Sequence, residues 1–200
     1  MAAEISLILG GARSGKSTFA ERLALGDGRP VTYLATAEPK DPEMAERIAI
    51  HKSRRPSSWK TWEGAAEELP GAIGSLSGVL LLDCLTMWLT RLFLVGEAAE
   101  KANEEEWFGR EAEIRAMTES LCNAPKGETH LIIVSNEVGF GLVPPYIMGR
   151  RFRDLQGRMN QLCASKASRA ALVVAGYPLW VKGGAPCPDE RSGVNDKQKI

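Results

Sequence analysis

Eight residues near the start of the chain have the types and spacing of a phosphate-binding loop, G-x-x-x-x-G-K-[ST]. Glycines let such a loop curl until successive backbone N–H groups point into one hollow, and the N-terminus of a following helix adds unpaired donors and a favourable dipole. The lysine can reach the β- and γ-phosphates of a nucleotide, and the hydroxyl can join the coordination of Mg²⁺. The pattern therefore predicts a site for a nucleoside triphosphate with Mg²⁺, in which Lys16 is catalytic and Ser17 is a metal ligand. The residues of the loop are Gly10, Gly11, Ala12, Arg13, Ser14, Gly15, Lys16 and Ser17.

A carboxylate ends an apolar run farther along the chain. Asp83 directly follows Val79-Leu80-Leu81-Leu82, and at the end of a buried strand such a side chain can hold Mg²⁺ directly or through water. The alternative is that Asp83 caps a helix that begins near Thr86, and the two roles are compatible. We expect Asp83 to be a metal ligand together with Ser17.

Cationic side chains surround His51, one of only two histidines in the chain. Arg47 precedes it by four residues and so shares its face of a predicted helix. Neutral imidazole is a nucleophile near pH 7, and neighbouring cations both keep it neutral and stabilise charge that builds on an attacked phosphate. The alternative is a solvated basic helix with an incidental histidine, which composition alone favours. The second histidine, His130, precedes an apolar run and is expected in an exposed loop. The other nearby cations are Lys52, Arg54, Arg55 and Lys60.

Short apolar runs alternate with segments of helical periodicity along the chain. Asp41-Pro42-Glu43 supplies an N-cap, a proline and an acid, which predict the start of the helix that contains His51, and Pro56 marks its end. The alternation indicates an α/β domain in which helices cover both faces of a mostly parallel sheet. Strands are expected near residues 5–9, 31–35, 79–83, 131–135 and 171–175, and further helices near 16–25, 86–95, 111–121 and 149–168.

Size and charge exclude several classes of protein. The chain has 200 residues, of which 44% are hydrophobic and 25% charged, and its formal net charge is zero. These values suit one globular domain and argue against disorder and nucleic-acid binding. The most apolar stretch, residues 79–95, contains Asp83 and Arg91 and is short for a membrane span. We expect a single domain over residues 1–182 and a flexible tail over 183–200.

Cysteine usage and the first residues predict a cytoplasmic location. The four cysteines are far apart and include no Cys-x-x-Cys pair, which argues against a zinc site and against a disulfide framework. No secretory signal is recognisable after Met1. We therefore expect free thiols in a reducing compartment. The cysteines are Cys84, Cys122, Cys163 and Cys187.

Many short blocks, in the same order along the chain, resemble the bifunctional adenosylcobinamide kinase / adenosylcobinamide-phosphate guanylyltransferase family of cobalamin biosynthesis. The resemblance extends from about Ile5 to Lys182 and is far more specific than the phosphate-binding loop by itself. Beside that loop, its marks are Tyr33-Leu34-Ala35-Thr36-Ala37, Asp41-Pro42-Glu43-Met44, Arg47-Ile48 with His51, Arg55-Pro56 with Trp59 and Glu63, Asp83-Cys84-Leu85-Thr86, Asn136-Glu137-Val138-Gly139 with Gly141, Val143 and Pro144, and Phe152-Arg153-Asp154 with Gly157, Arg158, Asn160 and Gln161.

The resemblance implies a RecA-like P-loop NTPase fold with three layers, and two reactions. A nucleoside triphosphate, GTP or ATP, phosphorylates the aminopropanol hydroxyl of adenosylcobinamide. GTP then gives its GMP to adenosylcobinamide phosphate, which releases pyrophosphate and forms adenosylcobinamide-GDP. A histidine holds the guanylyl group in this family, and the matching residue is His51. The resemblance also suggests a symmetric homo-oligomer. Family nucleotide contacts outside the loop fall on Ala35, Thr36, Ala37, Lys52, Ser53, Arg54, Arg55, Glu63 and Asp83.

The residues alone leave two other classes of function open, because P-loops serve kinases, ATPases and regulatory GTPases alike. One is a plain P-loop small-molecule kinase without a covalent nucleotidyl intermediate. The other is a regulatory nucleotide-binding module, against which the lack of an Asn-Lys-x-Asp guanine-reading segment argues. Candidate apolar contacts for a large substrate are Trp88, Trp107 and residues 140–146, although core packing is favoured for Trp88.

Overall fold

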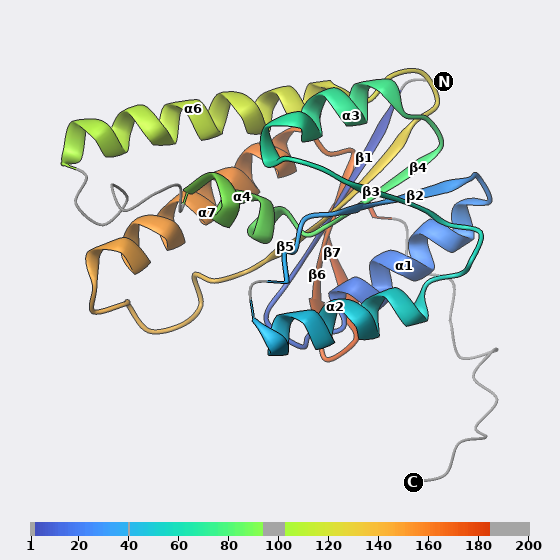
Figure 1. Ribbon diagram of the computed structural model, residues 1–200, viewed down its shortest axis with the longest axis horizontal. Coiled ribbons are helices and arrows are strands. Elements are labelled where there is room, and N and C mark those ends of the chain that lie inside the picture. Colours follow the sequence, from blue (N-terminus) through green and yellow to red (C-terminus); the bar gives the residue numbers. More distant parts are fainter. Residues whose placement is uncertain (1–2, 40, 94–102, 185–200) are drawn as a thin grey trace, which may run out of the picture.

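The computed structural model describes residues 3–39, 41–93 and 103–184. A seven-stranded sheet with the strand order β3-β2-β4-β5-β1-β6-β7 forms its centre (Figure 1). Neighbouring strands are parallel except β6 and β7, which form an antiparallel hairpin. The strands are β1 (Glu4–Gly10), β2 (Val31–Ala35), β3 (Lys60–Glu63), β4 (Val79–Asp83), β5 (His130–Asn136), β6 (Arg169–Val174) and β7 (Tyr177–Lys182).

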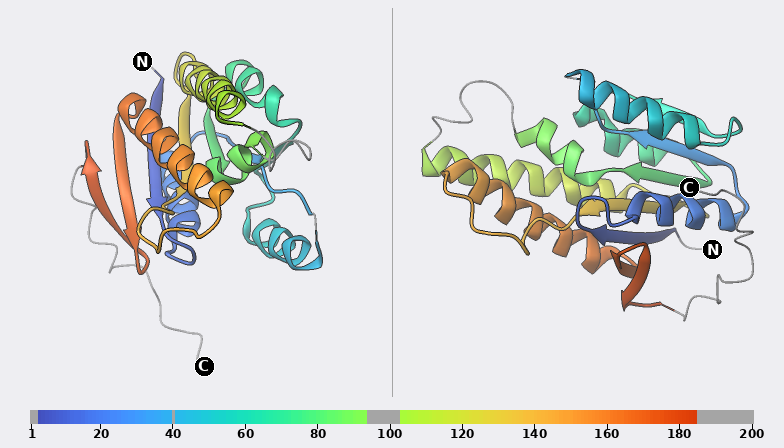
Figure 2. Two further views of the ribbon diagram at one scale, coloured as in Figure 1. Left: turned by 90° about the vertical axis from the view of Figure 1, so that its left-hand side faces the viewer. Right: turned by 90° about the horizontal axis from the view of Figure 1, so that it is seen from below.

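Helices pack on both faces of this sheet (Figure 2). On one face, Phe19 and Ala20 of α1 are buried against Ile8, Tyr33 and Val134 of the strands. On the other face, buried side chains of α3, α4, α6 and α7 form a second core with β1, β4 and β5. The prediction of a three-layer α/β fold with a mostly parallel sheet is confirmed. The helices are α1 (Lys16–Asp27), α2 (Pro42–Arg54), α3 (Leu69–Ser75), α4 (Leu85–Phe93), α6 (Glu104–Asn123) and α7 (Ile147–Lys166), and a 3-10 turn spans Ala66–Glu68.

Four parallel strands end side by side and form what we call the carboxyl edge of the sheet. Gly10 at the end of β1 pairs with Asn136 at the end of β5, and Ala35 at the end of β2 pairs with Asp83 at the end of β4. In open α/β sheets, ligands bind in the crevice outside the carboxyl ends of the strands. The fold thus brings the phosphate-binding loop and Asp83 to the edge where a nucleotide is expected.

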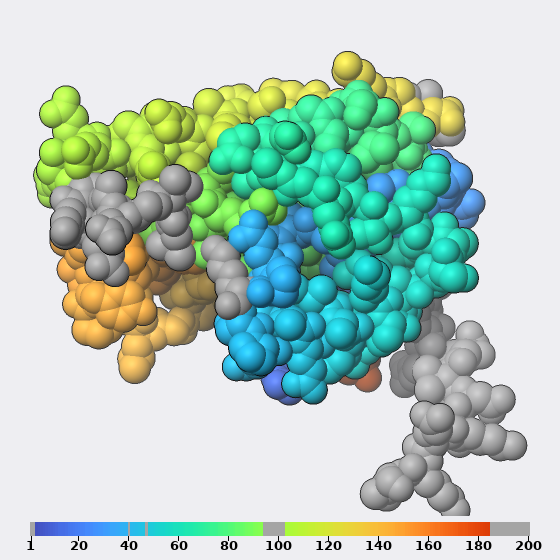
Figure 3. Space-filling view, viewed as in Figure 1, coloured from blue at the N-terminus to red at the C-terminus, as the bar shows by residue number. Residues whose placement is uncertain are grey.

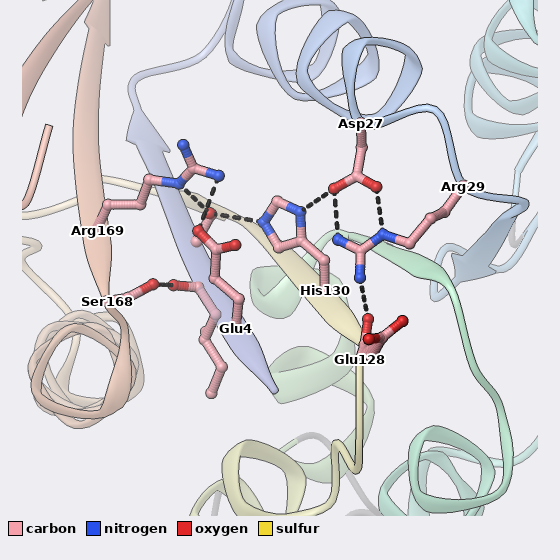
Figure 4. Close-up of polar contacts among 9 residues, drawn as sticks. Glu4, Asp27, Arg29, Glu128, His130, Ser168 and Arg169 are labelled. Atoms are coloured by element: carbon pink, nitrogen blue, oxygen red, sulfur yellow. Dashed lines mark hydrogen bonds and ion pairs between the residues drawn. The ribbon is translucent and has the colours of Figure 1, made fainter. Parts of the chain in front are cut away.

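His130 lies at the opposite edge of the sheet and is buried, so the expectation of an exposed loop is wrong (Figure 4). It is the first residue of β5. Its Nδ1 lies 2.8 Å from Asp27 Oδ2 at the end of α1, and its Nε2 lies 2.8 Å from Ser6 Oγ on β1. Both ring nitrogens therefore find polar partners more than 100 residues away in the sequence, which local spacing does not reveal.

Two arginines extend this buried polar network (Figure 4). Arg29 contacts both carboxylate oxygens of Asp27, at 2.5 and 2.7 Å. Arg169 on β6 donates to Ser6 Oγ at 3.0 Å and pairs with Glu4 at 2.8 Å. The network joins the end of α1 to the amino ends of β5, β1 and β6.

Several elements differ from the sequence-based expectations. Helical periodicity predicts a helix over 111–121, whereas α6 begins at Glu104, where Asn103 and Glu106 form a reciprocal capping box. The strands β3 and β7 and the helix α3 are not predicted by the sequence patterns. Within the described ranges, every helix is too short or too polar to span a bilayer.

Candidate active site

The phosphate-binding loop connects β1 to α1, as the motif predicts. Arg13 and Gly15 adopt positive φ angles of 58° and 90°, which turn the chain sharply into the helix. A Cβ added to Gly15 would lie 3.0 Å from Gly176 Cα, so a side chain there would press on the β6–β7 turn. The Gly176 N–H donates to the Ser14 carbonyl at 2.8 Å. The turn of the β6–β7 hairpin therefore packs against the phosphate-binding loop and holds it in place.

Lys16 is the first residue of α1, and its ammonium group is held within the loop. Its Nζ donates to the Gly11 carbonyl at 3.1 Å. Burial lowers the pKa of Lys16, while the neighbouring Cys84 and Asp83 oppose that effect. A phosphate would give the ammonium a charge-assisted partner in place of a neutral carbonyl, and such hydrogen bonds are about twice as strong.

Asp83 accepts hydrogen bonds from hydroxyl groups on two other elements. Ser17 Oγ on α1 lies 3.4 Å from its Oδ1, which is a long contact, and Tyr33 OH on β2 lies 3.2 Å from its Oδ2. Below it, Thr36 Oγ1 accepts from the Cys84 N–H and donates to the Cys84 carbonyl, both at 2.8 Å. The hydrogen-bond partners of Asp83 are thus hydroxyl groups of α1 and β2.

The donors at this position suit Mg²⁺. Ser17 and Asp83 offer one hydroxyl and one carboxylate, and Mg²⁺ is bound through one or two protein oxygens together with substrate phosphates. Among the described residues, no group of three or more His, Cys, Asp or Glu side chains could form a metal cage. A metal shared between protein and nucleotide therefore fits the residues present.

His51 lies on the last turn of α2 and is half-buried. The helix begins as predicted, because the Asp41 carboxylate accepts from the Met44 N–H at 2.8 Å and Pro42 occupies the first turn. Arg55 follows the helix, and its guanidinium lies 3.3 Å above the ring of Tyr33. Both His51 Nδ1 and Arg55 Nε are buried without a hydrogen-bond partner.

Glu21 is a further residue of this region that sequence reasoning missed. Burial raises the pKa of its carboxyl, Asp83 raises it further, and His51 and Arg55 partly offset the effect. The charges of Asp83, His51 and Arg55 thus act on the Glu21 carboxyl. Its position four residues after Ser17 on α1 is the signal that could have found it, because residues at that spacing share a helix face.

The remaining expected nucleotide contacts lie on several elements. Ala35 is the last residue of β2, and Thr36 and Ala37 follow it. Glu63, the last residue of β3, pairs with Ala35. These residues therefore lie at the carboxyl edge. Lys60 lies at the other end of β3. The side chain of Arg47 is outside the described residues. The other expected contacts are exposed residues of the last turn of α2, namely Lys52, Ser53 and Arg54.

An apolar, exposed segment follows β5 at the same edge. The Glu137 N–H donates to the Gly10 carbonyl at 3.0 Å, which ties the start of the segment to the phosphate-binding loop. Its large side chains are exposed, with Phe140 at 84% and Leu142 at 96%. Trp88 is fully buried in the core, as favoured from the sequence, and Trp107 is also buried.

Comparison with known proteins assigns the chain to a family. The model of the CobU family, cobinamide kinase / cobinamide phosphate guanyltransferase, matches residues 6–181. The chain belongs to this family. A family with two named reactions fits the bifunctional interpretation of the sequence and does not fit a plain kinase.

Two members of the cobinamide kinase / guanyltransferase family illustrate the similarity. The bifunctional adenosylcobalamin biosynthesis protein CobP of Pseudomonas aeruginosa is 42% identical over 179 residues, which are 88% of this chain and 96% of that protein. The bifunctional adenosylcobalamin biosynthesis protein CobU of Escherichia coli is 38% identical over 180 residues, which are 88% of this chain and 98% of that protein.

Solved structures agree with the predicted P-loop NTPase architecture of this family member. An ATPase from the type III secretion system of pathogenic bacteria matches with a TM-score of 0.50 at 18% identity, covering 84% of this chain and 50% of that chain. A protein from Pyrococcus horikoshii OT3 matches with a TM-score of 0.52 at 8% identity, covering 92% and 88%. At such identities the likeness concerns the fold alone.

Proposed function

We propose that this chain phosphorylates adenosylcobinamide with GTP or ATP and then transfers GMP from GTP to adenosylcobinamide phosphate through a guanylylated His51. Its family is named for cobinamide kinase and cobinamide phosphate guanyltransferase activities, and its relatives for adenosylcobalamin biosynthesis. The products of the second reaction are adenosylcobinamide-GDP and pyrophosphate.

The main structural support is a group of buried polar atoms without partners. Ser14 Oγ in the loop, His51 Nδ1 and Arg55 Nε are all buried and unpaired. Buried polar atoms in folded proteins are nearly always hydrogen-bonded, to protein or to something bound. Three of the seven such atoms among the described residues belong to predicted site residues, and a polyanionic ligand would give them partners. The other four are on Trp107, Thr129, Gln156 and Trp180.

In the guanylyl step, the loop amides and Lys16 hold the β- and γ-phosphates, which leave together as pyrophosphate. The imidazole of His51 forms a bond to the α-phosphorus while the bond from that phosphorus to the bridging oxygen breaks. A phosphate oxygen of adenosylcobinamide phosphate then attacks the phosphoramidate. This second attack frees His51 and completes the diphosphate of adenosylcobinamide-GDP.

In the kinase step, the same loop holds the triphosphate, and the γ-phosphorus rather than the α-phosphorus is attacked. The aminopropanol hydroxyl attacks the γ-phosphorus, and the nucleoside diphosphate leaves. Lys16 stabilises the charge on the transferred group, as lysines of such loops do. Ser17 and Asp83 would hold Mg²⁺, which neutralises phosphate charge when it is bound.

Labelling with GTP tests the covalent step. The wild-type protein incubated with GTP labelled at the α-phosphate should retain acid-labile label, and GTP labelled at the γ-phosphate should leave none. The His51→Ala variant should retain none, because the nucleophile is gone. The matched control is Ile50→Ala, which alters an exposed neighbour on the same helix and should label like wild type. Normal labelling of His51→Ala would refute the assignment.

We further propose a cytoplasmic location and a homo-oligomeric assembly. Cys84, Cys122 and Cys163 are free thiols, which suits a reducing compartment. The strand β7 is at the end of the sheet and exposes Tyr177, Leu179 and Val181. An edge strand with apolar side chains is a surface on which a second copy can pack.

A further inference from the structure

Tyr33 connects two parts of the candidate site that are on different elements. Its side chain is only 3% exposed, and its hydroxyl donates to Asp83 Oδ2 at 3.2 Å. On its ring, the Arg55 guanidinium lies 3.3 Å from the centroid. The contacts thus run from Ser17 through Asp83 and Tyr33 to Arg55.

Arg55 is in turn part of the end of α2. It caps the helix, and its backbone N–H donates to the Lys52 carbonyl at 3.3 Å. It lies four residues after His51 in the sequence. An element that holds Arg55 in place therefore also holds the last turn of α2, and with it the orientation of the His51 side chain.

Core packing does little to hold α2. Apart from Arg47, whose side chain is not described, its side chains are half-buried or exposed, and none is fully buried. Figure 3 shows the helix (cyan) on the surface of the molecule. A helix without buried side chains lacks the packing from which most helical stability in proteins comes. The Arg55–Tyr33 stack is consequently a principal attachment of its end to the sheet.

We propose that Tyr33 is a positioning residue for guanylyl transfer, which holds the end of α2, and with it His51, in line with the nucleotide bound beside Asp83. This inference rests on the proposed function of His51. The phenol orients the carboxylate, and the ring face orients the guanidinium.

Two substitutions distinguish the role of the Tyr33 hydroxyl from that of its aromatic ring. Tyr33→Phe removes the hydrogen bond to Asp83 and keeps the aromatic face, whereas Tyr33→Leu removes both. A desolvated cation–π contact is strong enough to change a rate by about tenfold. We expect Tyr33→Leu to slow the two reactions unequally. The factor by which it slows labelling of the protein by α-labelled GTP should be about tenfold larger than the factor by which it slows γ-phosphate transfer to adenosylcobinamide. Tyr33→Phe should leave the ratio of the two rates as it is in the wild type.

Phe19→Leu is the matched control. Phe19 lies in the same core cluster as Tyr33, is 3% exposed and packs on Trp180, so its loss weakens the core without touching Arg55. It should change both rates by the same factor. The inference is overturned if Tyr33→Leu also leaves the ratio unchanged, or if Tyr33→Phe alters the ratio as much as Tyr33→Leu. Failure of the proposed function looks different, because the wild type would then carry no label or His51→Ala would keep it.

Discussion

Asp83 is the residue on which both proposed reactions depend. It lies at the end of β4 and accepts hydrogen bonds from Ser17 on α1 and Tyr33 on β2. In the proposed mechanism, the kinase step and the guanylyl step each hold a triphosphate in the same loop. A ligand for the accompanying Mg²⁺ would therefore serve both steps, in contrast to His51, which is proposed to act in one.

The Asp83→Asn variant tests that difference. It keeps the shape of the side chain and removes the charge, so we expect both the kinase and the guanylyl rates to fall by about 100-fold or more. Rates measured across a range of Mg²⁺ concentrations would show the effect. Asp154→Asn, which alters a carboxylate that is 53% exposed, is the control for a lost negative charge. A variant that lost only one of the two activities would contradict the shared-site interpretation.

Local spacing was enough to predict some of these residues and not others. Lys16, Ser17 and Asp83 belong to short patterns with a known relation to a strand end or a helix start. Tyr33 has no such pattern, because its role arises from contacts with residues of other elements, and the only local signal of Glu21 is its spacing of four residues from Ser17. The same reason explains the wrong expectation for His130, whose partners come from α1 and β1.

At the level of elements, the buried network around His130 fixes the end of α1 to the sheet. The hydrogen bond from Arg29 holds the pKa of Asp27 well below its usual range, and His130 contributes in the same direction. A carboxyl whose pKa is lower in the folded than in the unfolded state stabilises the fold at every pH above its unfolded pKa of about 4. That contribution is lost as the pH falls below this value.

We therefore expect Asp27→Asn to lower the free energy of unfolding by about 1–3 kcal/mol at pH 7, since Arg29 and His130 lose their charged acceptor. The difference from wild type should shrink as the pH falls below about 4. Urea unfolding between pH 7 and pH 3 would measure it. A difference that stayed constant over this range would show that the ionised carboxylate is not the source of the stability.

The elements that the sequence did not predict share weak local signals. The turn between β6 and β7 uses Ala175 and Gly176 at φ angles of 51° and 85°, whereas Asn-Gly or Asp-Gly is the usual signal for two such residues. The helix α3 contains Gly71 and Gly74, which disfavour helices, and it is stabilised by burial of Leu69 and Ile73. Tertiary packing, rather than local preference, decides the structure at these places.

At the scale of the whole molecule, the described residues leave apolar side chains of β7, the last strand of the sheet, exposed. Trp180 packs on Phe19 of α1, whereas the alternate residues Tyr177, Leu179 and Val181 are 60–80% exposed. Because successive side chains of a strand point to opposite faces, Tyr177 and Leu179 share one face, and a register shift opposite Ala170 and Ala171 interrupts the alternation at Val181. They are the basis of the proposed contact between copies of the chain.

Light scattering on the purified protein tests that contact. We expect a mass that is a multiple of the 21.7 kDa chain. Leu179→Lys should reduce the mass, because a charge in the middle of an apolar contact is costly to bury. A wild-type protein that is monomeric at micromolar concentration would exclude the assembly, and an unchanged mass for Leu179→Lys would exclude this strand as the contact.

Buried polar atoms without partners are concentrated at the nucleotide end of the sheet, and this has an evolutionary consequence. Around His130 both ring nitrogens are paired and Thr129 Oγ1 is not, whereas Ser14, His51 and Arg55 each keep a buried polar atom unpaired. Substitutions that remove unpaired atoms are an easy route to greater heat resistance, often at the expense of function. Selection for a thermostable form of this enzyme should therefore accumulate inactive variants at the nucleotide end, whereas a substitution of Thr129 at the His130 end should leave activity intact.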